Sequence, residues 1–335
     1  MLNTSMLFAQ ASRHSAKVIL PINDVALSRH TPEPAFYCVH SVSGVAGKDF
    51  LELAQRVGPD VRFYGIQAPP KQMQDATFGS SIEAIATHYA DALVKFQPEG
   101  PLMLGGYCAG TVIALAMANI LRARGRQVGP LLAINGVPEN ARGSLRGWSL
   151  RYWTELVRNL PNWATHADLV RSRSFRLLAA SLMKNASALS KAAIGLKRAQ
   201  TLDGGFAMDG LMDLSIYRPE HRLFINRLAN ALFAYVPTPF NEEVVIYEAN
   251  TTPLLYLPQI GRRWQTFAPK TKIVSVVGTH LGIMREPYVG DLARDMRQRI
   301  CEFFSLAKAA PAERIQGQDL SSRERDFPQQ SRRNK

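Results

Sequence analysis

The sequence has few cysteines and no long hydrophobic run. Three cysteines occur in 335 residues, an odd number with wide spacing: Cys38, Cys108 and Cys301. This usage argues against a disulfide framework. No segment approaches the ~20 consecutive apolar residues that a membrane-spanning helix needs, so no membrane span is expected. The N-terminus lacks the basic start and apolar core of a secretory signal. These absences predict a cytoplasmic protein with reduced thiols.

Acidic residues are also scarce. The chain has 27 Asp and Glu against 40 Lys and Arg, a net charge of +13. The excess is concentrated between residues 141 and 200, which hold eleven basic residues against Glu155 and Asp168. Aromatic side chains do not alternate with these charges as base stacking requires, so no nucleic-acid partner is expected. Two interpretations stay open: a solvated helical face, or a docking surface for an acidic protein.

Strand and helix patterns alternate through two parts of the chain. Short apolar runs and amphipathic segments follow one another with short connections over 35–140 and again over 240–308. This alternation predicts an α/β protein with a mostly parallel, doubly wound sheet. Residues 141–238 show helical spacing without a strand pattern, which predicts a helical insertion.

We therefore expect three parts in the chain. Residues 1–30 form an N-terminal leader, and 31–308 form one α/β domain that carries the helical insertion at 141–238. Residues 309–335 are polar and charged, and they are predicted to form a disordered basic tail.

The segment LGGYCAG, residues 104–110, carries the strongest chemical signal. An apolar strand leads into it and a helix of small residues follows, while Gly106 and Gly110 flank Cys108 at two positions on either side. This is the nucleophile-elbow pattern of the α/β-hydrolase fold, in which the central residue is normally serine. The simpler interpretation is a tight strand–helix turn with an inert cysteine. Agreement among the strand, the glycines and the helix favours the elbow.

A nucleophile needs a partner that takes its proton. In α/β-hydrolases the order along the chain is nucleophile, acid and histidine, each after a strand. His280 follows the predicted strand 272–279 and fits the last position, although a histidine in a solvated loop would give the same pattern. No two histidines have metal-ligand spacing, so no metal site is expected.

The acid position holds an amide. Asn135 follows the predicted strand LLAI, where it either caps a turn or accepts a hydrogen bond from Nδ1–H of His280 through its amide oxygen. Glu248, at the end of another predicted strand, is the alternative acid. Replacing the carboxylate by asparagine costs a serine enzyme ~10⁴ in rate. A thiol ionises far more easily than a hydroxyl, so Cys108 and Asn135 are mutually consistent.

The oxyanion hole would use two backbone N–H groups. The residue after the nucleophile supplies one, here Ala109, and an early loop supplies the other. In this sequence the early loop is HSVSG, which offers Val42 or Ser43.

Several runs resemble the thioesterase domains of nonribosomal peptide and polyketide synthases. They occur in the order of that family and cover nearly all of 35–140 and 240–305: FYCVHSVSGVAG, VRFYGIQAP, SIEAIATHYADAL, QPEGPLMLGGYCAG and GTHLGIMREPYVGDLA. The family's nucleophile falls on Cys108, its histidine on His280 and its usual acid on Asn135. The insertion corresponds to the family's variable helical lid. A cysteine at the elbow also occurs in relatives that shuttle aminoacyl groups between carrier proteins, and in some that release products by ring closure.

The resemblance implies an enzyme of secondary metabolism. Its substrate would be a thioester on the phosphopantetheine arm of a carrier protein or synthase module, and the chain itself would bind no cofactor. Carrier proteins are usually acidic, which suits the basic insertion. The acyl group would pass to Cys108 and then to water or to another nucleophile. The alternative is a catalytically degenerate thioesterase that acts as a carrier-protein docking or scaffold protein.

Overall fold

The computed structural model describes residues 17–23, 34–136, 214, 217–251 and 260–309. Residues 310–335 of the predicted tail and the basic part of the predicted insertion, 141–200, lie outside the described residues, as does most of the predicted leader; residue 309, predicted as the start of the tail, is instead the last residue of a helix. Among the described helices, none is both long and apolar enough to cross a bilayer.

A seven-stranded sheet forms the centre of the described fold, in the order β1-β3-β2-β4-β5-β6-β7. All neighbouring strands are parallel except β1, which is antiparallel to β3. The strands are β1 Ile19–Pro21, β2 Ala35–Val39, β3 Arg62–Ile66, β4 Met103–Tyr107, β5 Leu131–Ile134, β6 Val244–Thr251 and β7 Thr271–Thr279. The expected mostly parallel, doubly wound sheet is confirmed. The strand β1 lies within the segment expected as leader and pairs with the edge of the sheet.

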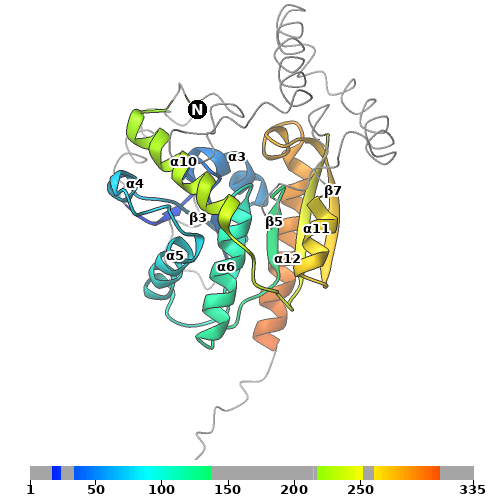
Figure 1. Cartoon of the computed structure of the whole chain (residues 1–335). Coiled ribbons are helices and arrows are strands. Elements are labelled where there is room, and N and C mark those ends of the chain that lie inside the picture. The colour runs from blue at the N-terminus through cyan, green and yellow to red at the C-terminus, as the bar shows by residue number, and fades with distance from the viewer. Residues whose placement is uncertain (1–16, 24–33, 137–213, 215–216, 252–259, 310–335) are drawn as a thin grey trace, which may run out of the picture.

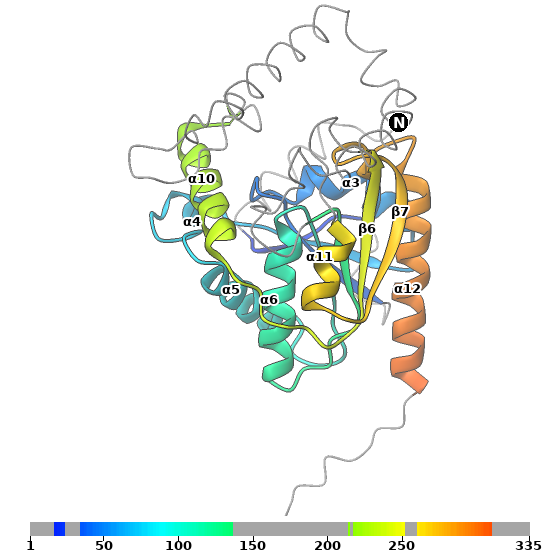
Figure 2. The ribbon, with the colours of Figure 1, turned by 45° about the vertical axis from the view of Figure 1, so that its right-hand side comes forward.

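Helices cover both faces of this sheet (Figures 1 and 2). The helices are α3 Gly47–Val57, α4 Pro70–Gln74, α5 Ile82–Phe96, α6 Gly110–Ala123, α10 Pro219–Ala234, α11 Ile260–Phe267, the short 3₁₀ helix η3 Gly282–Met284 and α12 Val289–Ala309. The helices α3 and α12 pack together on one face, while α5 and α6 pack together on the other. The two faces therefore bury two separate hydrophobic cores.

The helix boundaries follow from local chemistry. Apolar residues of α3 recur at helical spacing, and Phe50, Leu53 and Val57 are all buried. The helix ends at Gly58, whose φ of 92° suits a residue without a side chain. The Ser81 hydroxyl caps α5 by accepting a hydrogen bond from the backbone N–H of Ala84.

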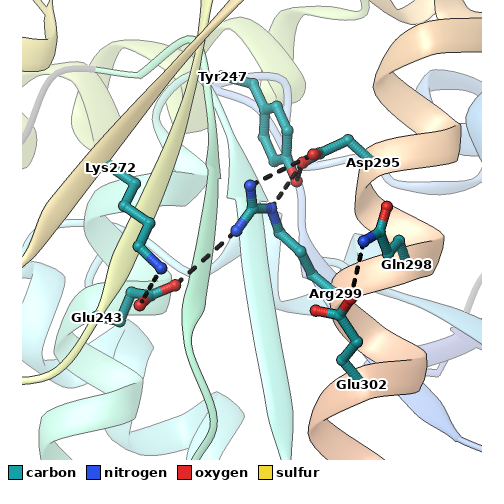
Figure 3. Close-up of polar contacts among 7 residues, drawn as sticks. All are labelled: Glu243, Tyr247, Lys272, Asp295, Gln298, Arg299 and Glu302. Atoms are coloured by element: carbon teal, nitrogen blue, oxygen red, sulfur yellow. Dashed lines mark hydrogen bonds and ion pairs between the residues drawn. The ribbon is translucent and has the colours of Figure 1, made fainter.

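Hydrogen bonds join the last helix to the sheet (Figure 3). The Tyr247 hydroxyl on β6 donates to Asp295 Oδ2 on α12 at 2.7 Å, and Arg299 Nε donates to the same oxygen at 2.7 Å. Burial alone raises the pKa of Asp295, but the hydrogen bonds from Arg299 and Tyr247 bring that pKa below its usual value. The charged carboxylate is therefore the form that the folded protein stabilises.

We expect Asp295→Ala to lower the free energy of unfolding by about 1–3 kcal/mol, because it leaves the buried Tyr247 hydroxyl without this acceptor. The loss should be largest at neutral pH and shrink as pH falls through the lowered pKa of the carboxyl, because protonation removes the charge that strengthens the bonds from Tyr247 and Arg299 in the wild type. Urea unfolding at several pH values measures both effects.

The matched control is Asp291→Ala on the same helix. Asp291 pairs with Arg294, and both side chains are 78% exposed. An ion pair this exposed contributes little, so its loss should change the free energy of unfolding by less than about 0.5 kcal/mol. Equal losses in the two variants would contradict the role given to the Tyr247–Asp295 contact.

Candidate active site

The loops that follow β2, β4, β5 and β7 meet at the carboxyl edge of the sheet. They carry the residues that the sequence singled out: Val42 after β2, Cys108 after β4, Asn135 after β5 and His280 after β7. In parallel sheets this edge is where ligands bind. Strand order explains the meeting, since β2, β4, β5, β6 and β7 are successive neighbours.

Cys108 occupies a strained turn between β4 and α6. Its φ is 55°, in the left-handed region that L-residues rarely adopt. A side chain at Gly106 would collide with the backbone of Gly110, and one at Gly110 would collide with the carbonyls of Val39 and His40. Both glycines are thus required for the close approach of β4, α6 and the β2 loop. The expected elbow geometry is present.

His280 reaches the elbow from the end of β7. The Tyr107 hydroxyl donates to its backbone carbonyl at 2.8 Å, and the two rings stack with centroids 5.0 Å apart. The imidazole and the Cys108 thiol are joined by a hydrogen bond. The structure therefore brings together two residues that lie 172 positions apart in the sequence.

Asn135 is the side chain that lies against Nδ1 of His280. Its φ is 45°, and its Nδ2 atom is 2.6 Å from that nitrogen. The Asn135 amide oxygen instead accepts a hydrogen bond from the backbone N–H of Ala249 at 3.0 Å. The residue is where the sequence placed it, but the expectation that the amide oxygen faces the histidine is wrong. The backbone of β6 takes the oxygen.

Glu248, the alternative acid, lies in β6 next to Ala249. Successive side chains of a strand point to opposite faces of the sheet. Tyr247 and Ala249 belong to the core beneath α3 and α12, which also contains Tyr107, the residue stacked on His280. The side chain of Glu248 therefore points toward the other face.

Two backbone N–H groups converge on the Cys108 sulfur, one from Ala109 and one from Val42. The N–H of Ser43 instead donates to the hydroxyl oxygen of Ser41 at 3.3 Å. Of the two early-loop donors left open by the sequence, Val42 is the one directed at the sulfur. Ala109 and Val42 are therefore the two backbone donors that lie against the sulfur.

Electrostatics around the sulfur favour an ion pair. Burial alone raises the pKa of Cys108, but the charge of His280, its hydrogen bond and the N–H groups of Ala109 and Val42 lower the pKa below its usual value. Burial lowers the pKa of His280, and the Cys108 thiolate more than reverses this, so that the pKa of the imidazole is raised. The site therefore favours thiolate and imidazolium together.

His40 was not expected to belong to the site, yet it fixes the early loop. The residue is fully buried, and burial lowers its pKa to about 4, so it is neutral at physiological pH. Its Nδ1 lies 2.5 Å from the Ser41 carbonyl oxygen, and its Nε2 lies 2.7 Å from the Tyr89 hydroxyl. A carbonyl only accepts, so Nδ1 carries the proton and Tyr89 donates to Nε2. The Ser41 carbonyl and the Val42 N–H belong to one peptide unit, so this chain of contacts orients the N–H directed at Cys108.

We expect Tyr89→Phe to lower kcat/KM of any reaction in which Cys108 is the nucleophile about fivefold, the equivalent of one lost hydrogen bond of about 1 kcal/mol. Steady-state kinetics on the folded variant measures this. Tyr37→Phe is the matched control, because that hydroxyl contacts Gln97 at 2.6 Å and no described residue of the site. Unchanged kinetics in Tyr89→Phe would show that the hydrogen bond from Tyr89 to His40 is not needed to orient the peptide unit between Ser41 and Val42.

Among the described residues, no group of three or more His, Cys, Asp and Glu side chains could hold a metal ion. The chemistry available at the described part of this edge is that of a thiol, an imidazole, an amide and two backbone N–H groups. These groups suit attack on a carbonyl carbon and stabilisation of the resulting oxyanion.

The sheet, the elbow and the loops around it define an α/β-hydrolase. A family model for the thioesterase domain matches residues 34–221, which is more than half of the chain. The chain therefore belongs to the thioesterase domain family, a family of hydrolases.

Curated relatives are much longer proteins. The chain is 25% identical over 295 residues to chondramide synthase cmdD of Chondromyces crocatus. This match covers 87% of the present chain and 7% of the synthase. The chain is also 34% identical over 116 residues to enterobactin synthase component F of Escherichia coli. That match covers 35% of the present chain and 8% of the synthase component. The chain thus spans less than a tenth of each of these two synthases.

Solved structures share the fold. The NocB thioesterase domain from the nocardicin cluster matches with a TM-score of 0.51 and 21% identity, covering 85% of this chain and 99% of that one. A four-domain nonribosomal peptide synthetase, AB3403, matches with a TM-score of 0.53 and 23% identity over 84% of this chain and 20% of that one. These likenesses confirm the α/β-hydrolase fold expected from the sequence.

Proposed function

We propose that this chain accepts an acyl or aminoacyl group from a thioester on the phosphopantetheine arm of a carrier protein. Cys108 is the nucleophile, His280 its proton acceptor, and Asn135 the residue that orients the imidazole. The acyl group then passes to water or to another nucleophile. The observation that carries the proposal is a lowered-pKa thiol at a left-handed elbow, hydrogen-bonded to a histidine and faced by two backbone N–H groups.

The acylation step balances without a cofactor. The Cys108 thiolate attacks the thioester carbon, and the Ala109 and Val42 N–H groups stabilise the negative oxygen that forms. The bond from carbon to the pantetheine sulfur then breaks, and the leaving sulfur takes a proton from His280. One thioester is exchanged for another, so the step is close to isoenergetic. The pantetheine belongs to the partner protein and not to this chain.

An acidic carrier protein or synthase module is the partner that we propose. The net charge of +13 attracts an acidic surface over a long range and speeds docking. The relatives named above are synthases, which supports a partner of the same biosynthetic kind.

Incubation of the purified chain with acyl-loaded carrier protein tests the proposal. Intact-mass analysis should find one acyl group on Cys108, together with free acid or transferred acyl product. Cys108→Ala should lose both the adduct and turnover, whereas Cys301→Ala on α12 should keep them. Turnover that survives in Cys108→Ala would favour the alternative, a degenerate thioesterase used for docking.

A further inference from the structure

The helix α10 contacts the loop that carries Val42. Nε2 of His221, on this helix, lies against the backbone carbonyl oxygen of Ser43. A carbonyl only accepts, so Nε2 carries the proton and donates it to this hydrogen bond. The two residues are 178 positions apart, and α10 falls within 141–238, the predicted insertion. The insertion therefore reaches the loop whose N–H is directed at the sulfur.

This contact is the first in a series of hydrogen-bonded peptide units. The Ser43 carbonyl and the Gly44 N–H belong to one unit, and that N–H donates to the Ser41 carbonyl at 3.1 Å. The Ser41 carbonyl and the Val42 N–H belong to a second unit, whose N–H is directed at Cys108. A hydrogen bond accepted by a carbonyl polarises its peptide unit and strengthens the N–H of that unit as a donor. Both units therefore pass an effect toward the sulfur.

The loop is shielded from water. Ser41 is 8% exposed and Ser43 is 6% exposed. The Phe224 ring of α10 covers Gly44 so closely that a Cβ atom on this glycine would lie 2.6 Å from a ring carbon. Water therefore does not readily take the place of the His221 N–H. Hydrogen bonds are also stronger in such surroundings than in water.

A separate group holds the side chains of this loop. The hydroxyls of Ser41 and Ser43 donate to Oδ2 of Asp49 on α3, at 3.0 Å and 3.4 Å. Asp49 thus fixes the hydroxyls, whereas His221 acts on the backbone. Loss of the His221 N–H should therefore change the orientation of the peptide units without unfolding the loop.

We infer that His221 is a positioning residue that acts through the two peptide units of the loop after β2 and sets the Val42 N–H as a donor at Cys108. His40 donates to the same Ser41 carbonyl, so the two histidines act on one peptide unit. The inference rests on the proposed function in one respect, that the Val42 N–H stabilises the oxyanion of the acylation step. The effect on the thiolate is independent of that reaction.

The variants His221→Gln and His221→Met test the inference as a pair. Both remove the imidazole and its contact with the Tyr217 ring. Glutamine and methionine have similar lengths, but only glutamine has an N–H donor. Both are good helix formers, so α10 is expected to persist in each variant, and equal melting temperatures would verify this. A difference between the two variants therefore reports the hydrogen bond and not the packing of the ring.

The first measurement uses the Cys108 thiolate and needs no acyl substrate. The Val42 N–H is one of the groups that lower the pKa of Cys108. Weakening this donor raises the pKa of the thiol. We expect iodoacetamide to alkylate Cys108 at pH 7 about threefold more slowly in His221→Met than in the wild type, with the midpoint moved to higher pH. His221→Gln should match the wild type.

Leu223→Ala is the matched control on the same helix, because that side chain is 61% exposed. Its alkylation profile should equal that of the wild type. Cys301 in each sample is the internal reference, and its rate should be the same in all four proteins.

The second measurement is turnover of an acyl-loaded carrier protein. A donor to the oxyanion acts on the transition state, so kcat should fall about threefold in His221→Met while KM stays unchanged. His221→Gln should restore kcat to the value of the wild type. A loss caused only by a disturbed helix would be the same in both variants.

Equal Cys108 alkylation profiles in His221→Gln and His221→Met would overturn the inference, whether both are slowed or both match the wild type. The proposed function would stand in that case if wild-type Cys108 is acylated. If wild-type Cys108 takes no acyl group while the two variants still differ in alkylation, the proposed function fails and the positioning role of His221 stands.

Discussion

Cys108→Ser is expected to lower kcat/KM for thioester turnover by about 10⁴-fold. A serine hydroxyl is a far weaker acid than a thiol and depends on a strong imidazole base. In serine enzymes, replacing the orienting carboxylate by asparagine alone costs this factor. Here Asn135 presents an N–H to Nδ1 of His280, so serine would meet the same deficit. Steady-state kinetics with an acyl-loaded carrier measures the loss.

The double variant Cys108→Ser with Asn135→Asp separates this explanation from a simple loss of the nucleophile. Aspartate supplies oxygens to both the Ala249 N–H and the histidine, which restores a base suited to a hydroxyl. We expect it to recover at least about 10²-fold of the lost activity, mostly as hydrolysis. Cys301→Ser, a thiol-to-hydroxyl change on α12, is the control and should behave as the wild type. A double variant no better than Cys108→Ser would contradict the coupling between positions 108 and 135.

His280→Ala should abolish the enhanced reactivity of the Cys108 thiol near neutral pH. In the wild type the lowered pKa of Cys108 means that alkylation by iodoacetamide reaches half its maximum rate at a lower pH than for an ordinary thiol. Without the imidazole, burial still raises the pKa of Cys108 and no positive charge opposes it. The midpoint should therefore move above that of an ordinary thiol. The rate at pH 7 should fall at least about tenfold.

Mass spectrometry of the peptide that contains Cys108, at several pH values, measures the midpoint. Cys301 in the same sample is an internal reference, and its rate should not depend on His280. His88→Ala is the matched histidine variant, because His88 lies on α5 and contacts Gln72. An unchanged Cys108 profile in His280→Ala would disprove the thiolate–imidazolium pair.

Much of the fold could be predicted from the chain. The alternation of apolar runs and amphipathic helices gave a parallel sheet, because each parallel connection needs a crossover helix. The elbow could be predicted because the close backbone approaches at Gly106 and Gly110 exclude any side chain. The two glycines are therefore required at fixed positions in the sequence. The short helix α11 has no strong signal of this kind, and it follows residues that the structure does not describe.

The site was only partly visible. Cys108, His280 and Asn135 could be singled out because each follows a strand, and the carboxyl ends of parallel strands share one edge. His40 could not be singled out. In the sequence, a histidine at the end of a buried strand looks the same whether it only fills the core or orients a neighbouring backbone peptide unit. Its partner Tyr89 lies 49 residues away. Nothing in the sequence indicates that pairing.

The sequence by itself determined which chemical groups meet at the edge of the sheet, since residue type and strand order are both encoded locally. Tertiary structure decided how those groups face one another. The N–H of Ala249 lies far along the chain from residue 135, and it draws the amide oxygen to itself because β5 ends one residue too soon to supply a carbonyl. A hydrogen bond between distant segments has no signature in either one, so only the folded chain shows which end of that amide the histidine meets.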